Sequence, residues 1–284
     1  MSARSHLYVP ADAPDKLTKA LTRGADSVIA DLEDAVAPDR KEGARRSLRQ
    51  WLSQLTTPVW VRVNSGAALE ADLDVLADGV HRGCLEGICL PKAEDPADLH
   101  RIAGWLDGLE REHPGPPVAL APIVESAAGL AAAVSLARAP RVTRLQLGEA
   151  DLSAELGIEA SADEVELAHL RGAVVLASAQ AGIGPPVGPA STDFTDLDRL
   201  RATTLRLRRF GFAGRTCVHP RQVTVVNEVF TPSAEQVDRA RRTLAGFTAA
   251  GSGAFADEHG RMVDAAVVRA ARRVLETAEQ GQPR

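Results

Sequence analysis

The sequence has 284 residues, of which 45% are hydrophobic and 25% charged, and its formal net charge is -5. This composition is typical of a soluble globular protein, and the length suffices for one large domain or two ordinary ones. The negative balance argues against a nucleic-acid-binding protein, which usually carries a basic excess. No apolar run approaches the length of a membrane span and the N-terminus lacks a hydrophobic signal core, so we expect neither membrane insertion nor export.

The three cysteines favour a reducing compartment. Cys84, Cys89 and Cys217 show no metal-ligand spacing, and an odd number cannot all pair in disulfides. We therefore expect a cytoplasmic protein whose thiols are free.

The first half of the chain alternates short apolar runs with helical patterns. Strands are predicted at residues 6–10, 27–33, 59–64 and 87–92. Helices are predicted after them, at residues 14–23, 40–55, 69–82 and 95–110. The third helix illustrates the signal, because Leu69, Leu73, Leu76 and Val80 recur at helix spacing.

The second half continues the same alternation. Strands are predicted at residues 118–125, 144–149 and 214–219, with a weak candidate at 186–192 that is rich in proline and glycine. Helices are predicted at residues 126–137, 161–182 and 197–210. Eight strand–helix units favour a (β/α)₈ barrel over an open sheet. No strand is followed by Gly-x-Gly-x-x-Gly, which weakens a dinucleotide-binding alternative.

Beyond the barrel the chain carries two further helical patterns, at residues 234–247 and up to residue 279. We therefore expect a barrel over residues 1–230 and a C-terminal helical extension over residues 231–284. The Gly/Ala/Ser stretch at 249–254 suggests a hinge, and a mobile cover over a site is one interpretation. An ordinary surface extension is the other, and composition does not separate the two.

Charged and polar residues gather where the predicted strands end. In a (β/α)₈ barrel the C-terminal strand ends form one mouth, where enzymes of this fold place their active sites. Each of these residues alone could be a solvated loop residue, but together they predict a site. They are Asp31, Glu33, Asp34, Arg62, Asn64, Lys92, Glu125, Glu149, Asp151 and His219.

Glu125 and Asp151 are the candidate metal ligands among them. Each is an acid that follows a short apolar run, and carboxylates at the ends of neighbouring strands converge. Mg²⁺ prefers oxygen ligands and is a natural partner for such a pair. Capping of the following helices is the alternative role, because an acid is favourable in a first helical turn.

Positive charge is needed to balance these acids, and Arg62 is the main candidate. At a strand end its planar fork could bind a carboxylate in a bidentate way or stabilise a developing oxyanion. A salt bridge to Asp31 or Glu33 is an alternative that does not exclude such a role. Lys92 and a bound metal would add further charge. His219 stands before a proline, and we interpret it as a structural residue rather than a general base.

Eight motifs resemble a known family. The chain resembles the citrate lyase β-subunit-like (CitE-like) CoA ester lyases of the HpcH/HpaI aldolase superfamily. The resemblance runs from about residue 4 to 275, nearly the whole chain, and its specificity rests on the order of the motifs. They are R-S-H-L-Y-V-P, G-A-D-S-V-I-A-D-L-E-D-A-V, V-R-V-N, L-P-K-A-E, I-V-E-S-A-A-G, G-E-A-D-L, G-R-T-C-V-H-P-R-Q and G-R-M-V-D-A-A.

The resemblance implies a (β/α)₈ barrel, commonly a homotrimer, that uses Mg²⁺ to cleave or form a carbon–carbon bond in a CoA thioester. Glu125 and Asp151 match the metal ligands, and Arg62 matches an arginine that contacts substrate. Glu33 and Asp34 match an acidic pair beside the water shell of the metal. Asp264 matches an aspartate that, in the CoA lyases, reaches into the site of a neighbouring subunit.

Three departures from the family pattern leave the metal ligands intact. Ala11 stands where glycine is frequent, and Ala266 stands where proline is common. The seventh-strand region lacks an aspartate that many members carry before T-D-F. This last departure weakens any assignment of the substrate by analogy.

The leading hypothesis is therefore a Mg²⁺-dependent lyase that cleaves a 3-hydroxyacyl-CoA of the citryl-, malyl- or citramalyl-CoA type into a 2-oxo acid and an acyl-CoA such as acetyl-CoA. Arg62 would stabilise the developing charge, and Asp264 would protonate the acyl-CoA enolate. Two alternatives stay open. One is a CoA-independent aldolase for a 2-oxo acid, and the other is the β subunit of a multi-subunit lyase that acts on an acyl-carrier-protein thioester.

Overall fold

The computed structural model describes residues 3–251, 253–257 and 259–280. The chain divides into two units, which are described separately below. One comprises residues 3–227, and the other begins at Glu228. The division falls inside helix α10 (Pro220–Phe230). In the part of the chain that the structure describes, no helix has the length and apolar character needed to cross a lipid bilayer.

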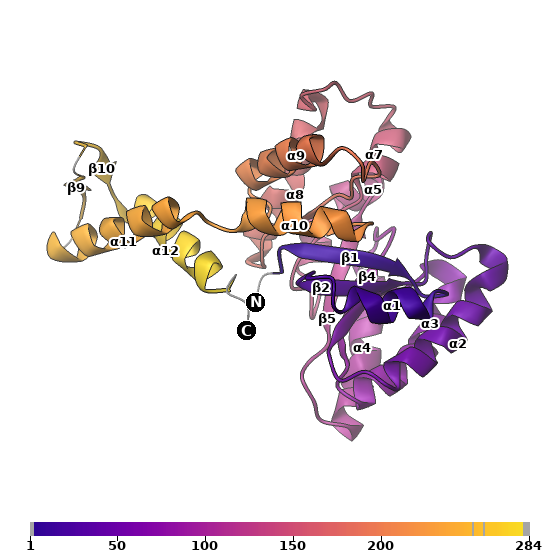
Figure 1. Ribbon diagram of the computed structural model, residues 1–284. Helices are drawn as coiled ribbons and strands as arrows, with labels where there is room; N and C mark the ends of the chain where they lie inside the picture. The colour runs from indigo at the N-terminus through magenta and orange to yellow at the C-terminus, as the bar shows by residue number, and fades with distance from the viewer. Residues whose placement is uncertain (1–2, 252, 258, 281–284) are drawn as a thin grey trace. The chain divides into compact units, whose positions relative to one another are not determined.

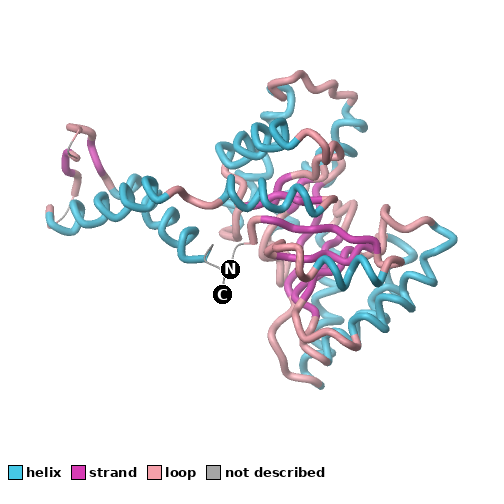
Figure 2. The backbone as a smooth tube through the Cα atoms, in the orientation of Figure 1, coloured by secondary structure: helices cyan, strands magenta, loops and turns pink. Residues whose placement is uncertain are grey.

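Eight parallel strands close into a barrel, in which each strand pairs with the next one along the chain. The barrel closes where β8 pairs with β1, with Ser5 opposite Arg215. Figure 2 shows these strands in the interior and the helices outside them. The predicted (β/α)₈ barrel is confirmed. The strands are β1 (Ser5–Pro10), β2 (Ser27–Asp31), β3 (Val59–Arg62), β4 (Leu85–Leu90), β5 (Ala119–Val124), β6 (Gln146–Leu147), β7 (Val187–Gly188) and β8 (Gly214–Cys217).

Helices connect successive strands and cover the outside of the barrel (Figure 1). Several begin at the signals that the sequence carries: Asp95 caps α4 ahead of Pro96, and Asp196 caps α9. The 3₁₀ turns η1 (Pro38–Arg40), η2 (Gly66–Ala68) and η3 (Val165–Leu167) precede three of them. The helices are α1 (Pro14–Ala20), α2 (Lys41–Leu52), α3 (Leu69–His81), α4 (Pro96–Glu112), α5 (Ala127–Ala131), α6 (Ala133–Ala137), α7 (Glu149–Leu156), α8 (Ala168–Ala181), α9 (Leu197–Phe210) and α10.

Several predicted elements differ from the structure. The strand expected at 144–149 is reduced to β6, and Glu149 lies in α7. The helix expected at 161–182 begins only at Ala168, because Glu164 takes a left-handed φ of 56° that an α-helix cannot contain. The strand expected at 186–192 is reduced to β7, since the prolines at 185, 186 and 189 have no N–H for a ladder. The helix expected at 126–137 is divided at Ala132 into α5 and α6.

The interior of the barrel contains an apolar cluster, and the buried polar residues His6 and Gln146 lie among the strands as well. Ile29, Trp60, Cys89 and residues of β5 form a buried cluster. Side chains alternate along a strand, so the residue two positions after an inward apolar residue also points inward. On β2 this places Asp31 above Ile29, and on β3 it places Arg62 above Trp60.

The second unit contains two helices and a small sheet. The helix α11 (Ala234–Ala249) begins at a capping box made by Ser233 and Gln236. Strands β9 (Phe255–Ala256) and β10 (Met262–Val263) pair antiparallel, which the sequence had not predicted. The helix α12 (Ala265–Gln280) follows. Of the residues in the hinge expected at 249–254, residue 252 lies outside the described part of the chain.

Packing inside the barrel predicts that a larger residue at position 87 destabilises the fold. A Cβ atom there would lie 2.4 Å from the Trp60 ring, which is in the buried cluster. Gly87→Ala should therefore lower the free energy of unfolding by about 1–3 kcal/mol through overpacking, as measured by urea denaturation.

Gly104→Ala on α4 is the matched control, because a Cβ atom there meets nothing within 4 Å. This exposed helical substitution should be neutral or stabilise by up to about 1 kcal/mol. Equal effects of the two substitutions would contradict the packing argument.

Candidate functional site

A cavity of ≈ 400 Å³ opens at the C-terminal ends of the barrel strands. Most of the charged residues predicted from the strand ends line it, together with apolar residues of β1, β5 and β6. The structure thus brings residues from distant parts of the sequence to one place. The charged lining residues are Asp31, Asp34, Arg62, Glu125, Glu149 and Asp151.

Arg62 is held between two acids of the neighbouring strand and loop. Asp31 lies beside it in the strand register and accepts hydrogen bonds from its Nε and Nη2, at 2.7 and 2.6 Å. Its Nη1 lies 3.0 Å from Glu33 Oε2. The guanidinium also lies over the Tyr8 ring, 5.0 Å from its centroid. The salt bridge considered as an alternative is therefore present, and it fixes the guanidinium at the wall of the cavity.

Electrostatics keep this group charged. Burial opposes the charge on Arg62, but the hydrogen bonds to Asp31 outweigh it and raise the pKa of the guanidinium. Burial likewise opposes ionisation of Glu33, but the hydrogen bond from Lys92 and the charge of Arg62 lower its pKa. For Asp34, burial and the Glu33 carboxylate raise the pKa. Glu33 is therefore the ionised member of this acidic pair, and Asp34 gains a proton more easily.

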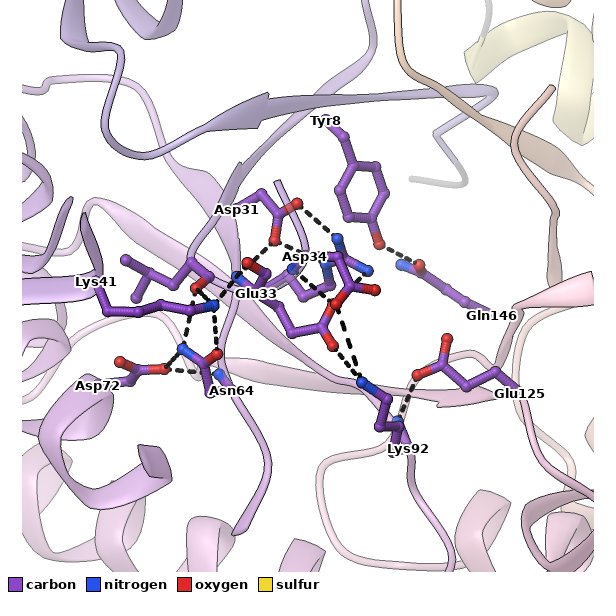
Figure 3. A network of polar contacts seen from close by, with 12 residues as sticks. Tyr8, Asp31, Glu33, Asp34, Lys41, Asn64, Asp72, Lys92, Glu125 and Gln146 are labelled. Carbon is purple, nitrogen blue, oxygen red and sulfur yellow. Dashed lines mark hydrogen bonds and ion pairs between the residues drawn. The ribbon is translucent and has the colours of Figure 1, made fainter. Parts of the chain in front are cut away.

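Lys92 connects this acidic pair to Glu125. Its Nζ donates to Glu33 Oε1 at 2.7 Å, and its backbone N–H donates to Glu125 Oε1 at 2.6 Å. Lys92 has a left-handed φ of 51°, which a non-glycine residue rarely adopts. This backbone conformation is part of the geometry that directs the N–H at Glu125. Figure 3 shows Lys92 between the two glutamates.

Glu125 is a buried carboxylate without a cationic side-chain partner among the described residues. It is 7% exposed and lies close to Gly148, where a Cβ atom would stand 2.4 Å from the Glu125 Cβ. Burial raises its pKa to about 7, against the hydrogen bond from Lys92, and the carboxylates of Glu33 and Asp151 add to the rise. The group is therefore partly protonated near neutral pH unless a cation approaches it.

Glu149 and Asp151 differ in their surroundings, although both lie in the first turn of α7. Both oxygens of Glu149 accept hydrogen bonds from the buried Arg171, at 2.6 and 2.8 Å. Arg171 also binds Glu164 at 2.9 Å. Asp151 is exposed at the cavity and forms no ion pair among the described residues. Asp151 is thus available to a ligand, whereas Glu149 is not.

These features fit a Mg²⁺ ion. Among the described residues no three acidic, histidine or cysteine side chains gather into a protein-only metal site. Mg²⁺ usually takes only one or two carboxylates and completes its shell with water and substrate. Glu125 and Asp151 face one cavity, lack cationic partners among the residues described, and repel each other. A divalent cation would relieve this repulsion.

The floor of the cavity contains polar residues that the sequence reasoning missed. Tyr8 donates its hydroxyl to Gln146 Oε1 at 2.7 Å, and Gln146 Nε2 lies 3.3 Å from Cys89 Sγ. Figure 3 shows the Tyr8 hydroxyl directed at the Gln146 side chain. A glutamine inside a short apolar strand was the available signal, because a buried amide needs a hydrogen-bond partner.

The remaining predicted residues have structural contacts. Asn64 donates from its backbone N–H and its Nδ2 to Asp72, at 2.6 and 2.7 Å. The His219 Nδ1 accepts from the Arg221 N–H, and its ring stacks on Phe194. This agrees with the structural interpretation of His219.

Asp264 belongs to the C-terminal unit and is described only within it. Its Oδ1 accepts from the N–H groups of Ala266 and Val267, at 2.9 and 3.0 Å. The hydrogen bond from Val267 lowers the pKa of its carboxyl. Asp264 therefore caps α12 and is ionised at neutral pH in this state.

Comparisons with known proteins identify relatives that match nearly the whole chain. The chain is 32% identical to an L-malyl-CoA/beta-methylmalyl-CoA lyase of Rhodobacter capsulatus, over 98% of this chain and 95% of the relative. It is 34% identical to a (3S)-malyl-CoA thioesterase of Cereibacter sphaeroides, over 97% and 94%.

A crystal structure of CitE from Mycobacterium tuberculosis, in complex with magnesium, acetoacetate and coenzyme A, superposes with a TM-score of 0.80. The two chains are 32% identical, and the match covers 98% of each. The model of the HpcH/HpaI aldolase/citrate lyase family matches residues 4–220. A barrel with an acidic, arginine-containing mouth thus coincides with a sequence match over most of the chain, and the protein belongs to the HpcH/HpaI aldolase/citrate lyase family.

Proposed function

We propose that the protein is a Mg²⁺-dependent carbon–carbon lyase that cleaves, or forms, a 3-hydroxyacyl-CoA thioester. The products of cleavage would be a 2-oxo acid and an acyl-CoA such as acetyl-CoA. The observation that carries the proposal is the cavity in which the unpaired acids Glu125 and Asp151 lie with the fixed guanidinium of Arg62. The similarity to a malyl-CoA lyase and to a CitE bound to magnesium and coenzyme A supports it.

Glu125 and Asp151 would hold the metal ion. Bound there, Mg²⁺ would make the hydroxyl group of the substrate easier to deprotonate and the nascent keto group more electrophilic. The backbone N–H of Lys92 would keep Glu125 Oε1 oriented, and Gly148 would leave room for its side chain. Arg171 would keep Glu149 out of the ligand set by binding both of its oxygens.

Arg62 would stabilise the oxygen that gains negative charge as the carbon–carbon bond breaks. Asp31 binds one fork of the guanidinium, so the donors that remain on the group keep a fixed direction. A donor fixed before the reaction needs no reorganisation in the transition state. Glu33 and Asp34 would accept hydrogen bonds from water beside the metal.

Asp264 would serve as the acid that protonates the enolate of the acyl-CoA, carried by a lid formed within residues 231–284. Its lowered pKa favours the carboxylate in the free protein. Closure over the substrate would bury the group, and burial raises the pKa of a carboxyl. In the condensation direction the same carboxylate would remove the proton from the acyl-CoA. We propose a cytoplasmic homo-oligomer, a trimer by its resemblance, in which Asp264 completes the site of a neighbour.

Hydrolysis of the thioester is the second candidate function, because a (3S)-malyl-CoA thioesterase is among the similar proteins. The products separate the two reactions. A lyase yields a 2-oxo acid and an acyl-CoA without free thiol, whereas a thioesterase yields a 3-hydroxy acid and free CoA. A CoA-independent aldolase would act on the free hydroxy acid, and a β subunit of a larger lyase would need an acyl-carrier protein.

The first test incubates the protein with Mg²⁺ and either malyl-CoA or citramalyl-CoA. We expect a 2-oxo acid, detected as its phenylhydrazone, together with an acyl-CoA. Asp151→Ala should abolish the Mg²⁺-dependent rate and leave the melting temperature nearly unchanged, because its side chain is exposed and unpaired in the described structure. Full activity of this variant, or release of free CoA as the main product, would contradict the proposal.

The pKa of Glu125 makes a prediction about stability. The folded protein binds a proton at Glu125 up to about pH 7, whereas the unfolded chain releases it near pH 4.5. Stability of the metal-free protein should therefore fall as pH rises between these values. Glu125→Gln removes this dependence, so melting temperatures of the variant and the wild type should diverge across that interval. Parallel curves would show that Glu125 titrates normally.

Asp264→Asn separates the two roles of Asp264. Asparagine caps a helix about as well as aspartate, so the melting temperature should change little. It cannot supply the proton, so kcat should fall by about 10²–10⁴-fold. Asp264→Ala, which also loses the cap, is the comparison and should be less stable by about 1 kcal/mol. Near-normal turnover of the asparagine variant would leave Asp264 as a cap alone.

Mixing tests whether Asp264 serves a neighbouring subunit. Asp264→Ala and Glu125→Ala are combined under conditions that exchange subunits. If sites are shared, some mixed oligomers contain a site with both residues intact and activity returns. Exchange without recovery would show that Asp264 does not serve a neighbouring subunit.

A further inference from the structure

Lys41 lies at the start of α2, behind the loop that carries the acidic pair. Its Nζ donates three hydrogen bonds, to Leu32 O at 2.7 Å, to Glu33 O at 2.6 Å and to Asn64 Oδ1 at 2.7 Å. An ammonium group has three N–H donors, and all three are used. Figure 3 shows this arrangement on the far side of Glu33 from Lys92.

The acceptors belong to the two loops that form one wall of the site. Leu32 and Glu33 follow β2, and Asn64 follows β3 two residues after Arg62. Asn64 Nδ2 also donates to Leu32 O at 3.0 Å, so the two loops are joined directly as well. Lys41 is therefore the point at which the loop of Glu33 and Asp34 is fixed relative to the loop of Arg62.

Helix formation does not explain a lysine at this position. A cation in the first turn of a helix is opposed by the helix dipole, and the three acceptors of Lys41 are neutral oxygens rather than carboxylates. Removal of the ammonium would leave the Glu33 carbonyl without this donor and free the loop to move. The side chain of Glu33 lies 3.0 Å from Arg62 and 2.7 Å from Lys92, and these distances depend on the path of that loop.

We propose that Lys41 is a positioning residue that holds the loop of Glu33 and Asp34 against Arg62 and thereby sets turnover through Glu33. It rests on the proposed function, in which Glu33 acts beside the metal. Lys41 itself does not line the cavity in the described structure. Its effect on the reaction therefore has to pass through the residues that it holds.

A double-mutant cycle tests the proposal. The kcat of the full-length protein is measured with Mg²⁺ and the active thioester for the wild type, Lys41→Met, Glu33→Gln and the double variant, by single turnover where rates are low. Lys41→Met should lower kcat by about tenfold with a much smaller change in KM. In the Glu33→Gln background the same substitution should lower kcat by no more than about twofold.

Arg141→Met is the matched control for lost stability. Arg141 is a half-buried cation that binds Asp107, Glu110 and the Val118 carbonyl, outside the cavity lining. It should lower the melting temperature at least as much as Lys41→Met while kcat stays within about twofold of the wild type. If Lys41→Met does not fold, Lys41→Gln, which keeps two donors, replaces it in the cycle.

Additive losses of kcat, or a normal kcat in the lysine variant, would overturn the proposal, because both would show that Lys41 does not act through Glu33. A loss of activity in Arg141→Met equal to that in Lys41→Met would also overturn it, as a general effect of stability. The proposed function fails separately: if the wild type releases free CoA and a 3-hydroxy acid, the lyase assignment is wrong, and the cycle is then read on that hydrolysis.

Discussion

Several carboxylates lie close together at one end of the barrel, and the structure depends on the interactions that balance their charge. Asp31, Glu33, Glu125 and Asp151 all come within reach of the cavity or of its arginine, and carboxylates that lie close together disfavour one another's ionisation. Arg62 forms ion pairs with Asp31 and Glu33, at distances of 2.6 to 3.0 Å. Glu125 and Asp151 receive no such cation from the described residues, and this is the physical basis of the proposal that they hold a metal ion.

Backbone groups, in addition to charged side chains, hold the acids of the site in place. Lys92 adopts a left-handed conformation in which its N–H meets Glu125 while its ammonium meets Glu33. Gly148 leaves the space that the Glu125 side chain occupies. Lys92 thus links Glu125 and Glu33, which belong to different loops. Because Gly148 has no side chain, the end of β6 can lie close to Glu125. The site is therefore a property of the loops as much as of the strands.

The sequence predicted the barrel, and it predicted that acidic residues gather at one mouth, because strand ends in a (β/α)₈ fold lie together. Asp31 and Glu125 each follow an apolar run in the sequence, and both line the cavity in the structure, as expected for strand ends. The helix expected at 161–182 was wrong at its beginning, where Glu164 takes a left-handed conformation and its carboxylate pairs with Arg171 and Arg206. Such pairs join distant segments and leave no local pattern.

Other misses have similar causes. Lys41 was not singled out from the sequence, because the carbonyl groups that it binds carry no sequence signal. The small sheet of β9 and β10 has strands of two residues, too short for a period to be recognised. The structure was needed wherever the partner is a backbone atom or a side chain from a distant segment, as for Tyr8 and Gln146.

The order of residues in the turn that begins α7 has a consequence for the charge seen by a ligand. Glu149 and Asp151 both line the cavity, but successive residues of a helix are turned by about 100°, so the two side chains leave α7 in different directions. Arg171 of α8 neutralises Glu149 by binding both of its oxygens. Of the two acids, Asp151 is the one without a cationic partner among the described residues. A CoA thioester is an anion at long range, and each unpaired acid at the mouth slows its approach. By burying Arg171 beside Glu149, the described structure offsets the charge of that acid and leaves Asp151, the proposed metal ligand, without a cation.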